Sequence, residues 1–148
     1  MKADAFLTSH LILLKESYLK VTHKSLPINH SVDVITAFSN CPYAIASHDT
    51  NSVFNYANEA SLQLFKTNWD EMIGVHSSVS ASKSSQSDRN KMLKEVARVG
   101  FVEDYKGTRV AFDGSLFQIN DAIIWNIVDS KNNSQGQAVL IMDHSLYE

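Results

Sequence analysis

The chain has 148 residues, a formal net charge of −3 and a single cysteine. This length is typical of one domain and can bury roughly 68–70% of the surface of the unfolded chain. Hydrophobic residues make up 44% of the sequence and charged residues 20%, a balance that excludes a disordered chain. The cations are scattered along the chain, so we expect no direct binding of nucleic acid, which needs many cations on one face.

The lone cysteine and the pattern of hydropathy indicate the cellular compartment of the protein. Cys41 has no second cysteine with which to form an internal disulfide or a thiolate metal site. The longest apolar run near the N-terminus is Leu11–Leu14, which is too short for a signal-peptide core or a membrane span. We therefore expect a cytoplasmic protein that makes no contact with a membrane.

The first 40 residues predict two helices. Apolar residues spaced by four and three form a stripe on the first one: Leu7, Leu11, Leu14, Tyr18 and Val21. The stripe can pack on the rest of the chain or on the same helix of a second copy, and we expect a homodimer through its first four residues. Pro27 ends this segment, and a short helix follows from 31–33 to 40–42. We assign residues 1–40 to an N-terminal helical segment and 41–148 to the main domain.

The next part predicts a hairpin and short helices. Residues 43–48 and 53–56 read as strands around a polar turn. Asn58 can cap a helix that ends near Phe65, and residues 68–73 make another turn that ends at Gly74. The seven serines between Ser77 and Ser87 predict a loop.

The remainder predicts one longer helix and three strands. Asp88 begins the helix, Gly100 ends it, and its buried face holds Met92, Leu93 and Val96. Extended runs follow at 101–111, 116–128 and 137–143, and Asp113-Gly114 is a strong hairpin signal between the first two. The order is that of an α+β domain with a five-stranded antiparallel sheet covered on one face by short helices.

Several local motifs, in their order and approximate spacing, resemble the MEKHLA domain family. They are Ser47-His48-Asp49, 54–58, Leu64-Phe65, Trp69-Asp70-Glu71, 104–109, Ile124-Trp125-Asn126 and Gly136-Gln137-Ala138. The family is related to PAS domains and occurs as stand-alone bacterial proteins and at the end of certain plant homeodomain–leucine zipper transcription factors. The resemblance spans nearly the whole chain and implies a PAS-like fold of the stand-alone bacterial type.

The PAS-like fold implies a pocket between the sheet and its helices. We expect the pocket to be lined from the following residues: Ile45, Phe54, Asn55, Tyr56, Leu64, Trp69 and Trp125. Strand alternation makes either Trp125 or Asn126 face the helices. Arg109 can clamp an acidic ligand or form a surface ion pair.

Other polar residues have two interpretations each. His48 can contact a ligand or cap the hairpin turn, and Asn55 can point into the pocket or close a turn. An isolated His76 does not justify haem. Cys41, beside Pro42, reads as a buried inert thiol rather than a flavin-reactive one.

These residues predict a sensory or ligand-binding domain that binds an unidentified small molecule and signals through protein contact. The candidate ligand-binding residues are His48, Asn55, Tyr56, Trp69, Arg109, Trp125 and Asn126. No catalytic residue, metal site or particular cofactor is assigned. Two alternatives stay open. A ligand-free interaction module would have a packed interior, and a small enzyme would bring His48, Asp49 and Asn55 within hydrogen-bond reach of one another.

Overall fold

The computed structural model describes residues 2–81 and 86–147, and it contains one antiparallel sheet between two sets of helices. The strand order is β2-β1-β6-β5-β3, and β4 also pairs with β5. The α+β sheet predicted from the sequence is confirmed. Because β3 and β4 pair with different parts of β5, together they occupy the place of a single edge strand.

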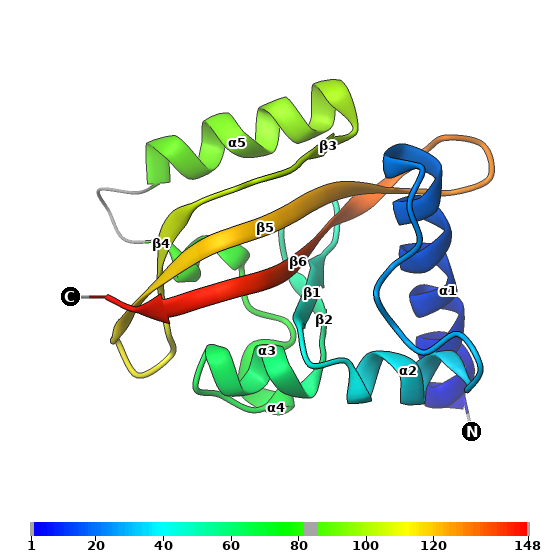
Figure 1. Cartoon of the computed structure of the whole chain (residues 1–148), viewed down its shortest axis with the longest axis horizontal. Coiled ribbons are helices and arrows are strands. Elements are labelled where there is room, and N and C mark those ends of the chain that lie inside the picture. The colour runs from blue at the N-terminus through cyan, green and yellow to red at the C-terminus, as the bar shows by residue number, and fades with distance from the viewer. Residues whose placement is uncertain (1, 82–85, 148) are drawn as a thin grey trace.

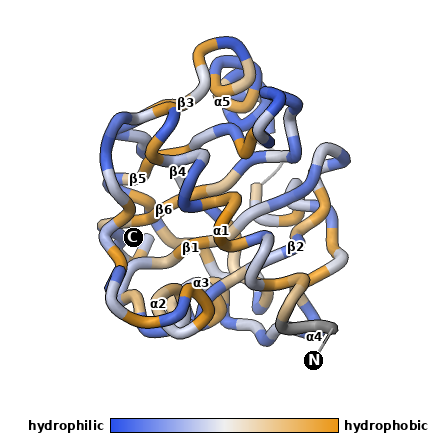
Figure 2. Tube along the Cα trace, turned by 90° about the vertical axis from the view of Figure 1, so that its right-hand side faces the viewer, coloured by the Kyte–Doolittle hydropathy of each residue, from blue (hydrophilic) through white to orange (hydrophobic). Residues whose placement is uncertain are grey.

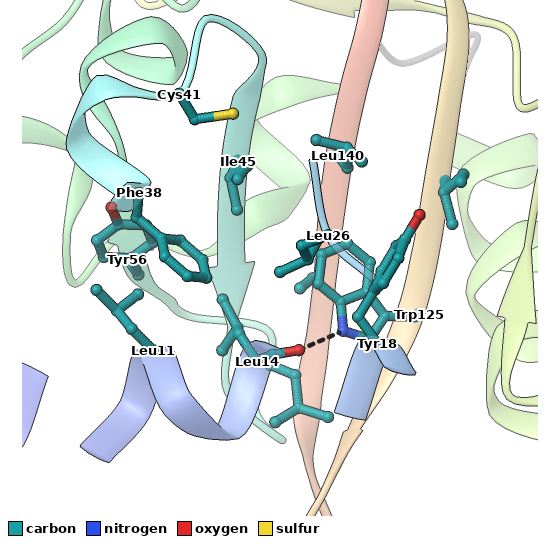
Figure 3. Close-up of a cluster of buried hydrophobic side chains, with 13 residues drawn as sticks. Leu11, Leu14, Tyr18, Leu26, Phe38, Cys41, Ile45, Tyr56, Trp125 and Leu140 are labelled. Carbon is teal, nitrogen blue, oxygen red and sulfur yellow. Dashed lines mark hydrogen bonds between the residues drawn. The ribbon is translucent and has the colours of Figure 1, made fainter. Parts of the chain in front are cut away.

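Helix α1 (Lys2–Thr22) covers one face of the sheet. In its predicted stripe, Leu11 and Leu14 are fully buried, Tyr18 is nearly so, and Leu7 and Val21 are partly buried. Tyr18 packs edge-on against Trp125 with ring centroids 4.9 Å apart, and Trp125 Nε1 donates to the Leu14 carbonyl at 3.3 Å (Figure 3). The stripe therefore packs on its own domain, the other of the two interpretations, which leaves Leu7 and Val21 partly exposed.

The hairpin and the first short helices follow the prediction closely. Helix α2 (Val34–Asn40) is capped by Asp33, and β1 (Ala44–His48) pairs with β2 (Phe54–Ala57). Asn58 caps α3 (Glu59–Leu64), as predicted, and Asn68 caps α4 (Trp69–Met72). Asn58 also ties α2 and β1 to this junction, because its amide nitrogen donates to the carbonyls of Phe38 and Tyr43.

The serine-rich segment is partly structured, which corrects the prediction of a loop. Ser77–Ser80 form the 3₁₀ helix η1, capped by His76, and Ser77 and Ser80 are buried. Helix α5 (Gln86–Val99) starts two residues earlier than expected, and residues 82–85 of the predicted loop lie outside the described residues.

The last strands form the centre and one edge of the sheet. The run 101–111 is interrupted at Asp104, which adopts a positive φ of 56°, so it becomes β3 (Phe101–Val102) and β4 (Gly107–Val110). The predicted turn at Asp113-Gly114 is confirmed, with Gly114 at φ 87°. It leads into β5 (Leu116–Val128), which pairs along its length with β6 (Ser134–Leu146).

The sheet separates two hydrophobic cores. Ile45, Trp125 and Leu140 face α1, whereas Ala46, Ala122 and Ile141 face the helices that follow β2. In Figure 1, β5 and β6 run between α1 and α5, which lie well apart. Figure 2 shows hydrophobic stretches on the strands in the middle of the view, while α5 carries both kinds of residue. The helices thus cover both faces of the sheet.

Candidate functional site

A small cavity lies between the sheet and the helices η1 and α5. Its volume is about 80 Å³, which accommodates several water molecules or a molecule of about four to six non-hydrogen atoms. The apolar part of its wall includes Phe54, Phe65, Met92, Leu93, Ile124 and Val139. The polar part includes His48, Ser77, Ser80, Arg89, Arg109 and Gln137. Most small-molecule pockets are several times larger.

Two arginines from different elements reach this cavity. Arg89 on α5 and Arg109 on β4 are each only 7% exposed. Arg89 donates to the hydroxyl of Ser77, and Arg109 donates to the Tyr105 hydroxyl and to the Thr108 carbonyl at 3.0 Å. The Arg109 guanidinium also lies over the Tyr105 ring, 5.2 Å from its centroid. The partners named here are all uncharged.

His48 lies at the end of β1 beside these arginines. Its Nδ1 is 3.0 Å from the Asp49 carbonyl oxygen, the turn-capping arrangement that the sequence offered as one interpretation. Burial, reinforced by the positive charge of Arg89 and by His76, lowers the pKa of His48, and the contributions of Asp49 oppose this only in part. The imidazole is therefore neutral near pH 7, and it adds no further positive charge to the cavity.

Two side-chain amides connect α5 to the central strands. Asn126 on β5 donates to the Val96 carbonyl at 2.9 Å, and Gln137 on β6 donates to the Leu93 carbonyl at 3.2 Å. Gln137 also donates to the Asn126 carbonyl oxygen at 3.2 Å. These bonds join α5 to both β5 and β6.

The structure brings some of the predicted site residues to the cavity. His48 and Arg109 line it, together with Phe54 from the predicted wall. Asn126 faces α5, as strand alternation allowed, although it serves as a connection rather than as part of the wall. Whether any of these residues binds a ligand remains a prediction.

The prediction that Trp125, Tyr56 and Ile45 line the cavity was wrong. All three belong to the core under α1, on the opposite face of the sheet. Trp125 follows Ile124, which does line the cavity, and successive strand residues point to opposite faces. The register of β1 and β2 shifts at Ser47/His48, which places Tyr56 opposite Ser47 on the α1 side.

The other expected wall residues also lie elsewhere. Asn55 accepts from the Ser47 hydroxyl at 2.5 Å, and His10 of α1 lies 2.9 Å from that hydroxyl. Trp69 is 38% exposed and packs edge-on against Tyr56. Leu64 lines a second, wider hollow of about 500 Å³ near the turn between β4 and β5 and the end of β6. Exposed side chains such as Lys66 and Leu146 line this hollow, so a ligand there would stay in contact with water.

The sequence contained a signal for Arg89 that its residue type obscured. Arg89 shares one helical face with Met92, Leu93 and Val96, at spacings of three, four and seven. A cation at an apolar position of an amphipathic helix indicates a buried charge. Ser77 and Ser80 were missed because a serine-rich run is typical of loops.

The polar cluster that a small enzyme would need is not assembled. The Asp49 carboxylate accepts from the backbone amides of Asn51 and Val53 at 2.8 and 3.0 Å, while His48 contacts the Asp49 backbone. Asn55 is engaged by Ser47 instead. Within residues 2–81 and 86–147, these three side chains share no hydrogen bond, so the convergence that the small-enzyme alternative requires is not observed.

Cys41 occupies the core under α1 rather than the cavity. It is 5% exposed, its thiol lies 3.6 Å from the Pro27 carbonyl oxygen, and burial raises its pKa. These observations confirm the prediction of a buried thiol. In the described part of the chain, no group of three or more His, Cys, Asp or Glu side chains is arranged to hold a metal ion, and no helix is both long and apolar enough to cross a membrane.

Solved structures define the class of this fold as that of PAS domains. The PAS domain of a Colwellia psychrerythraea protein is 15% identical, with a TM-score of 0.67 over 76% of this chain and 92% of that one. The PAS domain of a LuxR-family regulator from Burkholderia thailandensis, in complex with ethanol, is 17% identical, with a TM-score of 0.59 over 74% and 96%. Drosophila melanogaster Cycle PAS-B with bound ethylene glycol is 12% identical, with a TM-score of 0.58 over 70% and 99%.

Within this class, the chain belongs to the MEKHLA domain family, whose model matches residues 8–146. The match includes residues 8–22 of α1, so most of the helix that covers the second face of the sheet is part of the family's domain. This match confirms the resemblance noted in the sequence. No curated protein matches the chain.

Proposed function

We propose that this protein is a sensory domain, without catalytic activity of its own, that binds a small molecule under α5 and passes the change to a protein partner. The observation that carries the proposal is that the cavity and α1 lie on opposite faces of the same two strands, β5 and β6. On one face these strands line the cavity with Ile124 and Val139. On the other face they carry α1, through Trp125 and through Val128, whose amide and carbonyl both bond to Ser17.

This arrangement supports a route from ligand to output. A ligand that moves α5 also moves β5 and β6, because Asn126 and Gln137 hold them together. The same strands position α1, so the free energy of binding couples to the position of that helix. A ligand shifts such an equilibrium only by its difference in affinity for the two arrangements. Because the chain has a single cysteine, which suits a reducing compartment, we expect this sensor to act in the cytoplasm.

A thermal-shift series with very small neutral molecules tests binding. Ethanol, ethylene glycol and glycerol fit the size of the cavity, and solved PAS domains with ethanol or ethylene glycol are similar in fold. A ligand at a hundredfold excess over its dissociation constant stabilises the protein by about 2.7 kcal/mol. Val139→Phe fills the cavity and should abolish the shift, whereas Val99→Phe, on the exposed side of α5, should preserve it.

Hydrogen exchange tests whether ligand binding in the cavity changes α1. The ligand that gives the largest shift should change the protection of backbone amides in α1 as well as in α5. A change confined to α5 would refute transmission through the sheet. If none of the molecules in this or the charged series below stabilises the protein, the ligand-free interaction module becomes the better reading.

We retain a homodimer as the form in which the signal is delivered. Of the four stripe residues named from the sequence, Leu11, Leu14 and Tyr18 are buried in the domain and Leu7 partly so. Helix α1 has further apolar side chains that are exposed, Phe6 at 82% and Leu19 at 51%. Sedimentation equilibrium of the full chain should give twice the monomer mass, and Leu19→Glu should lower it. A monomer at all concentrations would direct the output to a different protein.

A further inference from the structure

Among the described residues that line the cavity, two carry a buried positive charge and none carries a negative one. In the described residues, the ion pairs are Lys66–Asp113 and Arg98–Glu95, and neither includes Arg89 or Arg109. Arginine cannot become neutral by losing its proton in a protein. A buried charge is normally paired, because removal from water costs free energy that neutral partners offset only in part.

The two guanidinium groups also oppose each other. Burial lowers the pKa of Arg89, and the positive charge of Arg109 lowers it further. The arginines come from α5 and β4, which are separate elements. Without a counterion, their mutual repulsion favours separation of α5 from β4. An anion between them would reverse this force and draw the two elements together.

The remaining wall specifies what kind of anion fits. Ser77 and Ser80 add hydroxyl groups near the arginines, while Ile124, Val139 and Met92 provide apolar surface. In the described part of the wall, no carboxylate would repel an anion. An apolar wall makes favourable contacts with a carbon chain, which phosphate, sulfate and chloride lack. Arginine binds a planar carboxylate through paired hydrogen bonds. The volume of about 80 Å³ suits a ligand of about four to six non-hydrogen atoms.

We infer that the cavity binds a small organic carboxylate of about two to four carbon atoms, held between Arg89 and Arg109 with its carbon chain against Ile124 and Val139. This inference rests on the proposed function, because it names the chemical class of the ligand for the same cavity. It also gives the signal a physical origin. The ligand cancels the repulsion between α5 and β4, and α5 is connected to the sheet through Asn126 and Gln137.

Titration calorimetry on the full chain tests the inference with sodium acetate, propionate and butyrate at constant ionic strength. Sodium chloride and the neutral propionamide are the reference compounds. We expect saturable binding of at least one carboxylate, at least tenfold tighter than chloride or propionamide. Equal binding of chloride would indicate a site for inorganic anions only and would overturn the carboxylate assignment.

Variants locate the site. Arg89→Met and Arg109→Met should each weaken carboxylate binding at least tenfold, while Arg98→Met, which changes an exposed arginine on the same helix, should leave it unchanged. Arg89→Met should also leave the midpoint of thermal unfolding of the ligand-free protein unchanged or raise it, because one buried like charge is removed. If Arg109→Met does not fold, Arg109→Lys keeps the charge but loses the paired hydrogen bonds, and it should still weaken binding. Unchanged carboxylate affinity in Arg89→Met and in the Arg109 variant that folds would overturn the inference.

The outcomes separate this inference from the proposed function. If ethanol or ethylene glycol stabilises the protein and no carboxylate does, the cavity binds ligands but the arginine clamp is wrong. If neither series stabilises it, both proposals fail. If carboxylates bind without any change in α1 protection, the ligand class stands and the route to α1 fails.

Discussion

Replacement of Asn58 by alanine should destabilise the protein more than the loss of an ordinary helix cap. The side chain is 2% exposed and makes four hydrogen bonds. Its carbonyl oxygen accepts from the amides of Ser61 and Ile45 at 3.0 and 2.9 Å, and its nitrogen donates to the carbonyls of Phe38 and Tyr43 at 3.0 and 2.9 Å. The residue therefore joins α2, β1 and α3.

The magnitude follows from the partners that alanine would leave behind. Loss of the cap to Ser61 costs about 1 kcal/mol. The Ile45 amide, buried and deprived of its acceptor, costs about 1–3 kcal/mol. The Tyr43 carbonyl adds about 1 kcal/mol, while the Phe38 carbonyl still accepts from Cys41. We expect a loss of about 3–5 kcal/mol, a large part of the 5–15 kcal/mol that stabilises a typical domain.

Urea unfolding monitored by far-UV circular dichroism measures this loss. Asn68→Ala is the matched control, because Asn68 caps α4 through a single bond to Glu71 at 3.0 Å and is exposed. Its expected cost is about 1 kcal/mol. If the two alanine variants lose the same free energy within about 0.5 kcal/mol, the assignment of Asn58 as a buried four-way junction is refuted.

Three further predictions concern the sheet and its two faces. Gly136→Ala should lower the free energy of unfolding by at least about 2 kcal/mol, because Gly136 has a φ of 121° and a β-carbon there would lie 1.9 Å from the His48 carbonyl oxygen. Gly74→Ala, with open space around the residue, should cost less. Equal losses in the two variants would contradict the close approach at Gly136. Burial lowers the pKa of His10 and His48 below the ordinary 6.5, so the unfolded state binds more protons as the pH falls through about 6.5. The free energy of unfolding should thus decrease from pH 7 toward pH 5, and His10→Gln should reduce that dependence; a flat profile in urea titrations would refute it. Trp125→Phe should lower the free energy of unfolding by about 1–2 kcal/mol through the lost hydrogen bond to α1. An unchanged thermal unfolding midpoint in this variant would show that the bond contributes nothing to stability.

Much of the fold could be predicted because local signals agreed with the global pattern. Asp113-Gly114 between two extended runs marks one hairpin, and Asn58 before an apolar run marks a helix start. Each signal acts over a few residues, so tertiary packing did not override it. The division of the chain at residues 40 and 41 stays a prediction, although α1 shares a core with the strands.

The site could be predicted less well, because a pocket depends on which face each residue takes. A single bulge between Ser47 and His48 sets the face of Tyr56, and no local pattern announced it. The order of helices and strands along the sequence did not reveal that α1 would cover the second face of the sheet. Trp125 was therefore assigned to the wrong face. Arg89 could have been singled out from its position on the helical face beside Met92 and Leu93, because that face packs against the rest of the domain.

The positive φ of Asp104 has a consequence for association between sheets. It breaks the outer strand into β3 of two residues and β4 of four, and the opposite edge, β2, also has only four. Long unpaired edges are where sheets add foreign strands and aggregate, and short edges interrupted by charged residues resist this. Glu103, Asp104 and Lys106 are exposed at the break. The sheet of this protein is thus poorly suited to growth by strand addition at either edge.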